Sequence, residues 1–177
     1  ASEVVEAVAA EFGVDTVIFL PDRFLGAHVA SQTKIRLVLW DGSCEVHETF
    51  TAQQVRHTRE QFHARVVAHP ECPPDVLAEA DFVGSTTAMG AWLEKEKPER
   101  VALVTECSMA DNLKSRFPDI EFVKPCNLCP YMQRITLPNI HACLLERKHV
   151  VHVPEDIAAG ARRALERMLA VGRRDRV

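Results

Sequence analysis

Two cysteines follow short apolar runs, at points where the chain is expected to leave a β-strand. Residues 35–40 predict a buried strand, and Cys44 follows it after a glycine. Residues 120–123 predict a second strand, and Cys129 follows that one after a proline. Ligands of α/β proteins bind at the carboxyl ends of parallel strands. The two cysteine loops therefore predict one shared site, where each thiolate could bind a metal ion or an iron–sulfur cluster.

Each cysteine taken alone also fits a second role, that of a small buried apolar side chain. The matching positions of Cys44 and Cys129 favour metal binding instead. Cys126 forms a C-x-x-C pair with Cys129, a spacing that suits a zinc knuckle or a redox dithiol as well as a cluster. Whether these two form a regulatory disulfide stays open. Cys107 and Cys143, in or beside predicted helices, are expected to be packing residues.

Histidine, glutamate and hydroxyl side chains follow other predicted strands. His47 and His69 lie just beyond strand ends, and Glu71 lies in a loop made rigid by flanking prolines. These three could transfer protons or orient a polar substrate, although an exposed histidine or glutamate is often only solvated surface. Ser85 and Thr86 open a helix after a strand, where hydroxyls and free amides could bind phosphate or carboxylate. The same two residues would also suit a plain N-cap.

Short apolar strands alternate with helices along most of the chain. Strands are predicted at residues 16–20, 35–40, 65–68, 81–83, 100–104 and 120–123. Helices are predicted at residues 25–31, 51–62, 75–79 and 109–117, with others that end at Gly13, end near Lys97 or begin at Pro154. This alternation predicts parallel sheets flanked by helices. Thr105 and Glu106, which follow the strand at 100–104, are a further candidate for a polar site.

The order of elements occurs twice. A strand, a polar loop, a helix, a second strand and a cysteine loop run from Val17 to Cys44 and again from Val101 to Cys129. This repeat has a period of about 85 residues, larger than a solenoid unit and typical of duplicated small domains. The predicted fold class is therefore α/β, with repeated small three-layer α/β/α domains built on short parallel sheets.

The repeat also predicts the domain organisation. Residues 1–44 are expected to form the carboxyl-terminal half of one domain, residues 45–129 a complete domain and residues 130–177 a helical tail. The chain begins without methionine and within a predicted helix. We therefore expect it to be the carboxyl-terminal part of something longer; the sequence leaves open whether that reflects a truncation, a fragment or a split enzyme.

Composition and charge narrow the classes of partner. The 177 residues carry a formal net charge of −4 at pH 7, which gives no basic footprint for nucleic acid or an anionic membrane. No apolar run approaches the roughly 20 residues that cross a bilayer. The sequence shows no signal peptide, which indicates the cytoplasm. Six cysteines in this length do not form a dense secreted disulfide pattern, so thiols or metal ligands are expected.

The motifs in this order resemble those of the quinolinate synthase family, and the likeness runs through nearly the whole chain. They are F-L-P-D at 19–22, W-D-G-S-C-E-V-H at 40–47, H-P-E-C-P at 69–73, D-F-V-G-S-T at 81–86, T-E at 105–106 and C-P-Y-M-Q-R-I-T-L at 129–137. The G-x-C-x-V-H motif, followed by H-P-E-C-P and then by G-S-T, is highly specific.

The resemblance implies a fold of three similar α/β/α domains about a pseudo-threefold axis, each supplying one cysteine to a [4Fe–4S] cluster. Residues 1–44 would belong to the middle domain and residues 45–129 would be the third. The tail would pack on the first domain, which this chain lacks. Cys44 and Cys129 would be two of the three cluster ligands, and Cys72 corresponds to no ligand.

The family reaction condenses iminoaspartate with dihydroxyacetone phosphate, losing phosphate and water, to make quinolinate for de novo NAD biosynthesis. The resemblance implies a transferase whose cluster has one open iron site that acts as a Lewis acid. His47, His69 and Glu71 would hold the substrate and transfer protons, with Glu71 as the general base. Ser85 and Thr86 would hold a substrate carboxylate or phosphate. L-aspartate oxidase or aspartate dehydrogenase would supply iminoaspartate, and this chain alone is expected not to catalyse.

Two other functions compete with this interpretation. The first is a zinc or redox-thiol module without enzyme activity, which would use Cys44, Cys126 and Cys129. The second is an interaction domain in which all cysteines are packing residues. Iron with labile sulfide would favour the cluster, zinc in a colourless protein would favour the first rival, and unreactive metal-free thiols would favour the second.

Overall fold

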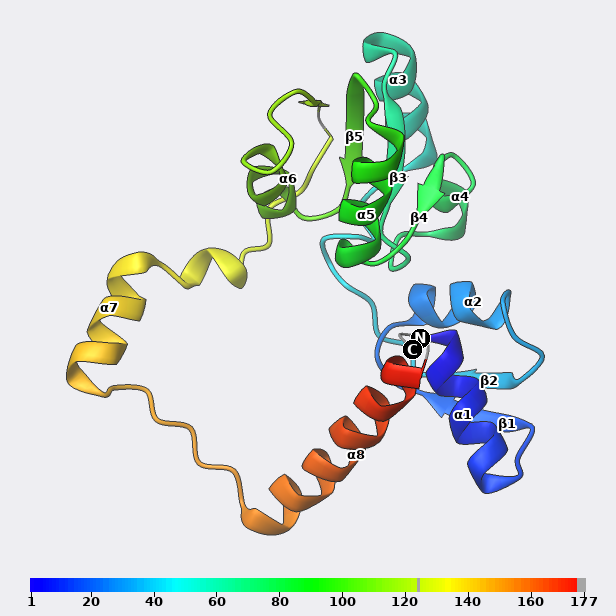
Figure 1. Cartoon of the computed structure of the whole chain (residues 1–177), viewed down its shortest axis with the longest axis vertical. Coiled ribbons are helices and arrows are strands. Elements are labelled where there is room, and N and C mark those ends of the chain that lie inside the picture. Colours follow the sequence, from blue (N-terminus) through cyan, green and yellow to red (C-terminus); the bar gives the residue numbers. More distant parts are fainter. Residues whose placement is uncertain (124, 175–177) are drawn as a thin grey trace.

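The computed structural model describes residues 1–123 and 125–174, so residue 124 and the end of the predicted tail, 175–177, lie outside the described residues (Figure 1). The described chain contains a two-stranded sheet, a four-stranded sheet and a mainly helical tail. All strand pairs are parallel. The predicted α/β class with short parallel sheets is confirmed.

The first unit is built on two strands. Helix α1 (Ser2–Phe12) ends, as predicted, at Gly13, whose φ of 62° is the left-handed conformation that glycine adopts without strain. Strand β1 (Thr16–Phe19), helix α2 (Arg23–Ala30) and strand β2 (Arg36–Leu39) follow. Val5, Phe19 and Val29 from three of these elements pack into one small core. The helices thus bury one side of the sheet.

The prediction that the strand at residues 35–40 is buried was wrong. The strand forms, but Val38 is 45% exposed and Trp40 63% exposed, and Ile18, opposite Val38 in the sheet register, is 70% exposed. Successive side chains of a strand point to opposite faces, so Ile18 and Val38 share the outer face. An apolar run predicts burial only where both faces of the sheet are covered, and here one face is not.

The second unit holds the four-stranded sheet, whose order is β4-β3-β5-β6. Its elements are α3 (Ala52–Phe62), β3 (Arg65–Ala68), α4 (Pro74–Leu77), β4 (Phe82–Val83), α5 (Thr86–Glu96), β5 (Arg100–Val104), α6 (Cys107–Lys114) and β6 (Glu121–Val123). The predicted strands 65–68 and 100–104 are confirmed to the residue. Helix α6 begins two residues earlier than predicted, because the Glu106 side chain caps it.

Both faces of this sheet are covered by helices. Val66 and Val104 point into a core shared with Val55 of α3, whereas Val67 and Leu103 point into a second core shared with α5 and α6. Thr51 caps α3 in a reciprocal hydrogen-bonded box with Gln54. The second unit therefore has three layers, and its two central strands are almost wholly buried.

The tail contains the short helix η1 (Met132–Arg134), α7 (Leu137–Glu146) and α8 (Glu155–Arg174). It leads away from the second unit and turns back, so that α8 lies beside α1 (Figure 1). There Arg167 pairs with Glu11 and lies over the Phe12 ring. Large apolar side chains of α7 and α8 are exposed, among them Leu144 and Leu165. The packing of this tail on a further domain stays a prediction.

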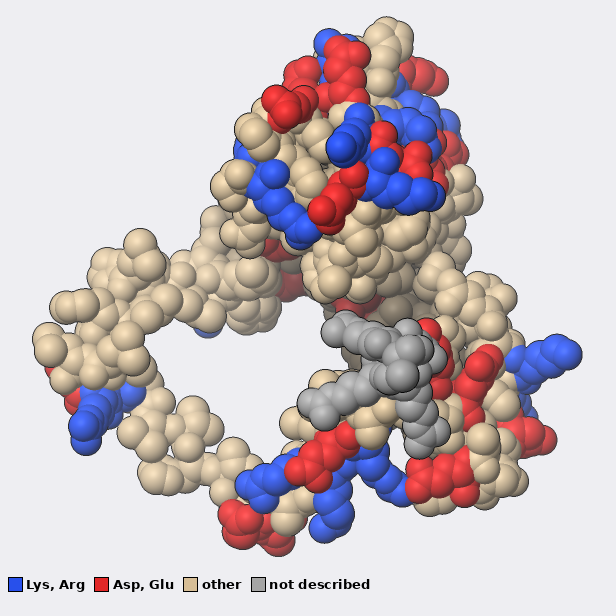
Figure 2. All heavy atoms as spheres, in the orientation of Figure 1, with Lys and Arg blue, Asp and Glu red and all other residues tan. Residues whose placement is uncertain are grey.

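Two surface features bear on partners. Acidic and basic side chains are interspersed over the second unit on the face that Figure 2 shows. Among the described helices, none combines the length and apolar character needed to cross a membrane.

Candidate metal and substrate site

Three predicted site residues meet at the carboxyl ends of the strands. Cys44 follows β2, His47 follows Cys44 by three residues in a tight turn, and Glu71 follows β3. The Cys44 sulfur, a His47 ring nitrogen and a Glu71 oxygen all lie within 4.8 Å of one another. Residues from the two sheets thus form one compact group of polar donor atoms. Within the described chain, Cys129 is not a member of this group.

His47 is the centre of the group. Its side chain is nearly buried, and its Nε2 lies 3.0 Å from the Thr105 hydroxyl oxygen. Its ring stacks on that of His69, with centroids 4.5 Å apart and planes 19° from parallel. Nδ1 lies 3.1 Å from Glu71 Oε2, an electrostatic contact without the alignment of a hydrogen bond. Among the described residues, this buried nitrogen has no aligned hydrogen-bond partner and faces the Glu71 carboxylate.

Charge and burial set the protonation states of Glu71 and His69, the two titratable neighbours of His47. Contact with His47 lowers the pKa of Glu71, and burial acts in the opposite direction. Burial lowers the pKa of His69, as does the nearby His47, while Glu71 and Asp22 oppose this. Near neutral pH, Glu71 is therefore a carboxylate and His69 a neutral imidazole. Both forms can accept a proton.

Cys44 is a free, half-buried thiol at the start of a tight turn. Its carbonyl oxygen accepts hydrogen bonds from the amides of His47 and Glu48, at 3.1 and 3.0 Å. Its own amide donates to Asp22 Oδ2 at 2.9 Å. The backbone on both sides of Cys44 is therefore fixed, and the turn brings His47 back toward the thiol.

Cys129 is the second free, half-buried thiol at a strand end. Its amide donates to Glu106 Oε1 over 3.4 Å. Two residues earlier, the Asn127 side-chain amide donates to the carbonyl of Val46 at 3.1 Å and to the Thr49 hydroxyl at 2.9 Å. The loop that carries Cys129 is therefore fastened to the segment that follows Cys44.

Cys126 is bonded to Cys107 in a disulfide, with the two Cα atoms 5.0 Å apart. The prediction that Cys107 is a packing residue was wrong, as was the expectation that the cysteines are thiols or metal ligands. The early start of α6 places Cys107 beside the loop after β6, where its amide also donates to the Asn127 carbonyl at 3.0 Å. Cys126 is accordingly not a free partner for Cys129.

Two other cysteines lie outside the group. Cys72 is fully buried beneath the Val104 carbonyl, and burial raises the pKa of its thiol to about 12. Such a thiol is protonated at neutral pH and is a poor metal ligand. Cys143 is half-buried in the tail, where its thiol donates to the Lys148 carbonyl.

Ser85 and Thr86 lie at the carboxyl end of β4, the edge strand next to β3. The Ser85 hydroxyl accepts a hydrogen bond from the Ala88 amide at 3.3 Å and so caps α5. Both residues are exposed. They lie at the same end of the sheet as Glu71 but do not belong to the compact group.

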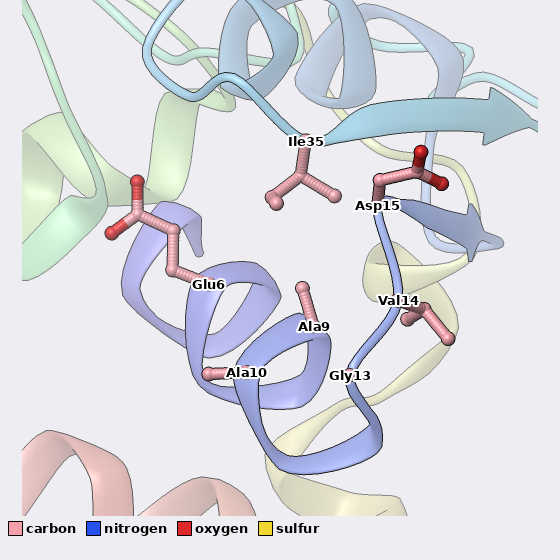
Figure 3. Close-up of a pocket in the computed structure, with 7 residues that line it drawn as sticks. All are labelled: Glu6, Ala9, Ala10, Gly13, Val14, Asp15 and Ile35. Carbon is pink, nitrogen blue, oxygen red and sulfur yellow. The ribbon is translucent and has the colours of Figure 1, made fainter.

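A separate pocket lies at the opposite, amino-terminal ends of β1 and β2 (Figure 3). Its lining comprises Glu6, Ala9, Ala10, Gly13, Val14, Asp15 and Ile35. None of the predicted site residues lines it. The candidate site is therefore defined by its converging side chains and is not this cavity.

Comparison with known proteins identifies the family. The family model described as Quinolinate synthetase A protein matches residues 1–170. The chain belongs to this family. It is 53% identical over 167 residues to "Quinolinate synthase 2" of Mesorhizobium japonicum, and 51% identical over 172 residues to "Quinolinate synthase" of Xylella fastidiosa. These matches cover 94% and 97% of the chain but 52% and 50% of the relatives, so it spans about half their length.

Two residues that contact the cysteine loops are not among the candidates predicted from the sequence. Asp22 occurs there only within the motif at 19–22, and Asn127 lies unremarked between Cys126 and Cys129. A signal was present for Asp22: like Glu106, it stands between the end of a strand and the start of a helix. Thr105, a secondary candidate, turns out to contact His47 directly.

Proposed function

We propose that this chain provides part of the active site of a cytoplasmic quinolinate synthase. That enzyme would condense iminoaspartate with dihydroxyacetone phosphate to quinolinate, with loss of phosphate and water, in de novo NAD biosynthesis. Iminoaspartate would come from L-aspartate oxidase or aspartate dehydrogenase. Family membership and the names of the relatives support the proposal. The observation that carries it is the convergence of Cys44, His47 and Glu71 at the strand ends.

Cys44 and Cys129 would hold a [4Fe–4S] cluster, and the donor set fits this group. Iron–sulfur clusters are bound by cysteine thiolates, and Cys44 and Cys129 are half-buried free thiols in strand-end loops that are fastened to one another, whereas the free thiol of Cys72 is fully buried. When bound, the cluster would supply an open iron site that acts as a Lewis acid on substrate oxygens.

Glu71 and the two histidines would handle protons. Condensation requires removal of a proton from carbon, and dehydration requires protons for the departing oxygens. The Glu71 carboxylate and the neutral His69 can accept a proton at neutral pH, and the unpartnered Nδ1 of His47 lies next to Glu71. The contact between Thr105 and Nε2 holds the His47 ring in this orientation. We assign the general base to Glu71.

Ser85 and Thr86 would bind the substrate phosphate or a carboxylate. They lie at the amino terminus of α5, where backbone amides and the helix dipole favour an anion. They follow β4, which pairs with β3, the strand that leads to Glu71, so they lie at the same end of the sheet as the proposed base.

We propose that residues 1–44 are half of a middle domain, residues 45–129 a third domain and residues 130–177 a tail that packs on a first domain, about a pseudo-threefold axis. The relatives, which are about twice as long, support this, as do the exposed side chains of Ile18 and Val38. By itself, the chain would lack one cluster ligand and would not catalyse.

The test is quinolinate formation after anaerobic iron–sulfur reconstitution. The chain would be assayed alone and in a chimera in which it replaces the matching half of the Mesorhizobium japonicum relative. We expect quinolinate from the chimera and none from the chain alone. Robust turnover by the chain alone would disprove the fragment proposal, and an inactive but cluster-loaded chimera would disprove the assigned function.

A second candidate is a non-catalytic zinc site. The disulfide removes Cys126 from the ligand set predicted for it, but Cys44, His47 and Glu71 have the donor types and proximity of a zinc site. Metal analysis distinguishes the two candidates. Iron with acid-labile sulfide and a brown colour support the cluster, whereas one zinc in a colourless protein supports this alternative.

A further inference from the structure

A buried carboxylate at the start of α2 contacts the backbone of Cys44. The Asp22 side chain is the N-cap of this helix and is 3% exposed. One of its oxygens, Oδ1, accepts a hydrogen bond from the Leu25 amide at 2.7 Å. The other, Oδ2, accepts from the Cys44 amide at 2.9 Å. The carboxylate therefore joins the helix start to the cysteine loop.

The second unit contains the same arrangement. Glu106 is the N-cap of α6, and its Oε2 accepts a hydrogen bond from the Ser108 amide at 2.7 Å. Its other oxygen, Oε1, accepts from the Cys129 amide at 3.4 Å. In both units, one carboxylate oxygen serves the helix and the other serves the cysteine that follows the next strand.

The two pairs occupy equivalent places in the chain. Asp22 precedes Cys44 by 22 residues and Glu106 precedes Cys129 by 23, in both cases with one helix and one strand between them. Glutamate is not among the residues preferred as N-caps, since shorter side chains suffice to reach the helix amides. The longer side chain allows Glu106 to reach the Cys129 amide as well.

Other helix caps show what a plain N-cap does. The side chains of Thr51 and Thr136 accept hydrogen bonds from amides of their own helices, those of Gln54 and Asn139. Among the described residues, neither threonine accepts a hydrogen bond from a cysteine amide. Within that part of the chain, the link to a cysteine is found at the two helices that precede the cysteine loops.

We propose that Asp22 and Glu106 are matched positioning residues that hold Cys44 and Cys129 so that both thiols face one common ligand. This rests on the proposed function, in which the two thiolates bind the same cluster. A hydrogen bond from an amide to a carboxylate is stronger than one to a neutral acceptor, and groups outside the ligands commonly orient them. Neither carboxylate needs to touch the cluster to act in this way.

The test compares cap-preserving variants of the 177-residue chain, without added reductant so that the disulfide stays closed. Asp22→Ser and Glu106→Ser keep a side chain that caps a helix but cannot reach the cysteine. Thr51→Ala removes a cap that touches no cysteine. Amide hydrogen exchange at Cys44 and Cys129 is then measured by NMR.

We expect Asp22→Ser to speed exchange at Cys44 at least about tenfold, equal to about 1.4 kcal/mol, and to leave Cys129 unchanged. Glu106→Ser should speed exchange at Cys129 by a smaller factor, because its contact is longer, and leave Cys44 unchanged. Thr51→Ala should change neither residue selectively. If Asp22→Ser does not fold, Asp22→Asn retains the size and one acceptor oxygen, and the same Cys44-specific increase is expected.

The rate of iron loss to a chelator is a second readout, which tests whether the two cysteine loops hold the proposed cluster. After anaerobic reconstitution with ferrous iron and sulfide, we expect Asp22→Ser and Glu106→Ser in the chimera to lose iron to a chelator several-fold faster than wild type or Thr51→Ala. This inference alone is overturned if the wild type binds iron but amide exchange at Cys44 is unchanged in Asp22→Ser and exchange at Cys129 is unchanged in Glu106→Ser. A wild type that binds no iron overturns the proposed function and the ligand-positioning role with it. An equal response of both cysteines to every variant also overturns the inference, because it indicates general loosening.

Discussion

The units β1–α2–β2 and β5–α6–β6 follow the same path but fasten their cysteine loops differently. The Cys44 loop is held by a short contact to a buried carboxylate and by its own tight turn. The Cys129 loop has a longer carboxylate contact and is held in addition by the Cys107–Cys126 disulfide and by Asn127. In the Cys129 loop, the weaker hydrogen bond to a carboxylate is thus accompanied by a disulfide and by the hydrogen bonds of Asn127. The position of the cysteine and its amide contact with a helix-capping carboxylate are repeated, whereas the other bonds that fix the loop are not.

The two sheets also differ, in how many of their faces are covered by helices. The four-stranded sheet has helices on both faces, whereas the β1–β2 sheet leaves Ile18 and Val38 on an open face. Stability should therefore be concentrated in the second unit, while the site is formed where loops of both units meet.

Replacing Glu71, the proposed general base, should have the largest effect. Glu71→Gln keeps the shape of the side chain but removes its capacity to accept a proton, so we expect quinolinate formation by the chimera to fall by about 100-fold or more. Glu60→Gln on exposed α3 is the matched control and should be near wild type. A Glu71→Gln variant with unchanged kcat would contradict the assignment of the base.

Core truncation should distinguish the two sheets. Leu93→Ala removes a fully buried side chain of α5, so we expect the free energy of unfolding to fall by about 2–5 kcal/mol. Ile18→Ala on the open face of β1 should cost far less in the isolated chain. Urea denaturation measures both variants. Equal losses would show that the outer face of β1 is buried in solution.

Opening the disulfide should affect only one of the two cysteine loops. The Cys107→Ser/Cys126→Ser variant removes a link across 19 residues, which stabilises a protein by about 3 kcal/mol through restriction of the unfolded chain. We expect a lower denaturation midpoint and faster amide exchange at Cys129, with no change at Cys44. A faster exchange at both cysteines would mean that the disulfide also supports the Cys44 loop, through the contacts of Asn127 with Val46 and Thr49.

The dependence of stability on pH should show two smaller steps. The pKa of His69 is lowered from 6.5 by burial, and that of Glu71 is lowered from 4.5 mainly by His47. The unfolded chain therefore binds protons more readily at both residues, so stability is complete above pH 6.5 and falls in two steps as the solution is acidified.

Single variants assign the two steps. His69→Gln should reduce the loss that begins below pH 6.5, to which His28 also contributes because burial lowers its pKa. Glu71→Gln should reduce the loss that begins below pH 4.5. His57→Gln, on an exposed position of α3, is the control. Denaturation midpoints from about pH 3 to pH 8 provide the measurement, and an unchanged slope in His69→Gln would contradict the first assignment.

The sequence predicted the elements well and the side-chain contacts less well. The strands 65–68 and 100–104 were correct because β-branched runs between turn residues have few alternatives. His47 and Glu71 each follow the carboxyl end of a strand, where ligand sites of α/β proteins lie, but the two strands belong to different sheets, so their meeting depends on how the two units pack. The prediction that the strand at 35–40 is buried was wrong, because an apolar run does not indicate whether both faces of its sheet are covered.

The missed contacts share one physical cause. The disulfide between Cys107 and Cys126 depends on where α6 begins, and the nearer C-x-x-C spacing pointed elsewhere. The roles of Asp22 and Asn127 depend on which backbone amides and carbonyls lie opposite them after folding. Neither kind of contact leaves a periodic pattern along the chain.

The central claim is that Cys44 and Cys129 bind one cluster. The most direct test is the iron and acid-labile sulfide content of the reconstituted chimera and of its Cys44→Ser, Cys129→Ser and Cys143→Ser variants. We expect about four irons and four sulfides in the wild type and in Cys143→Ser, and loss of both in each of the other two variants. A Cys44→Ser or Cys129→Ser chimera that keeps the full cluster would contradict the account.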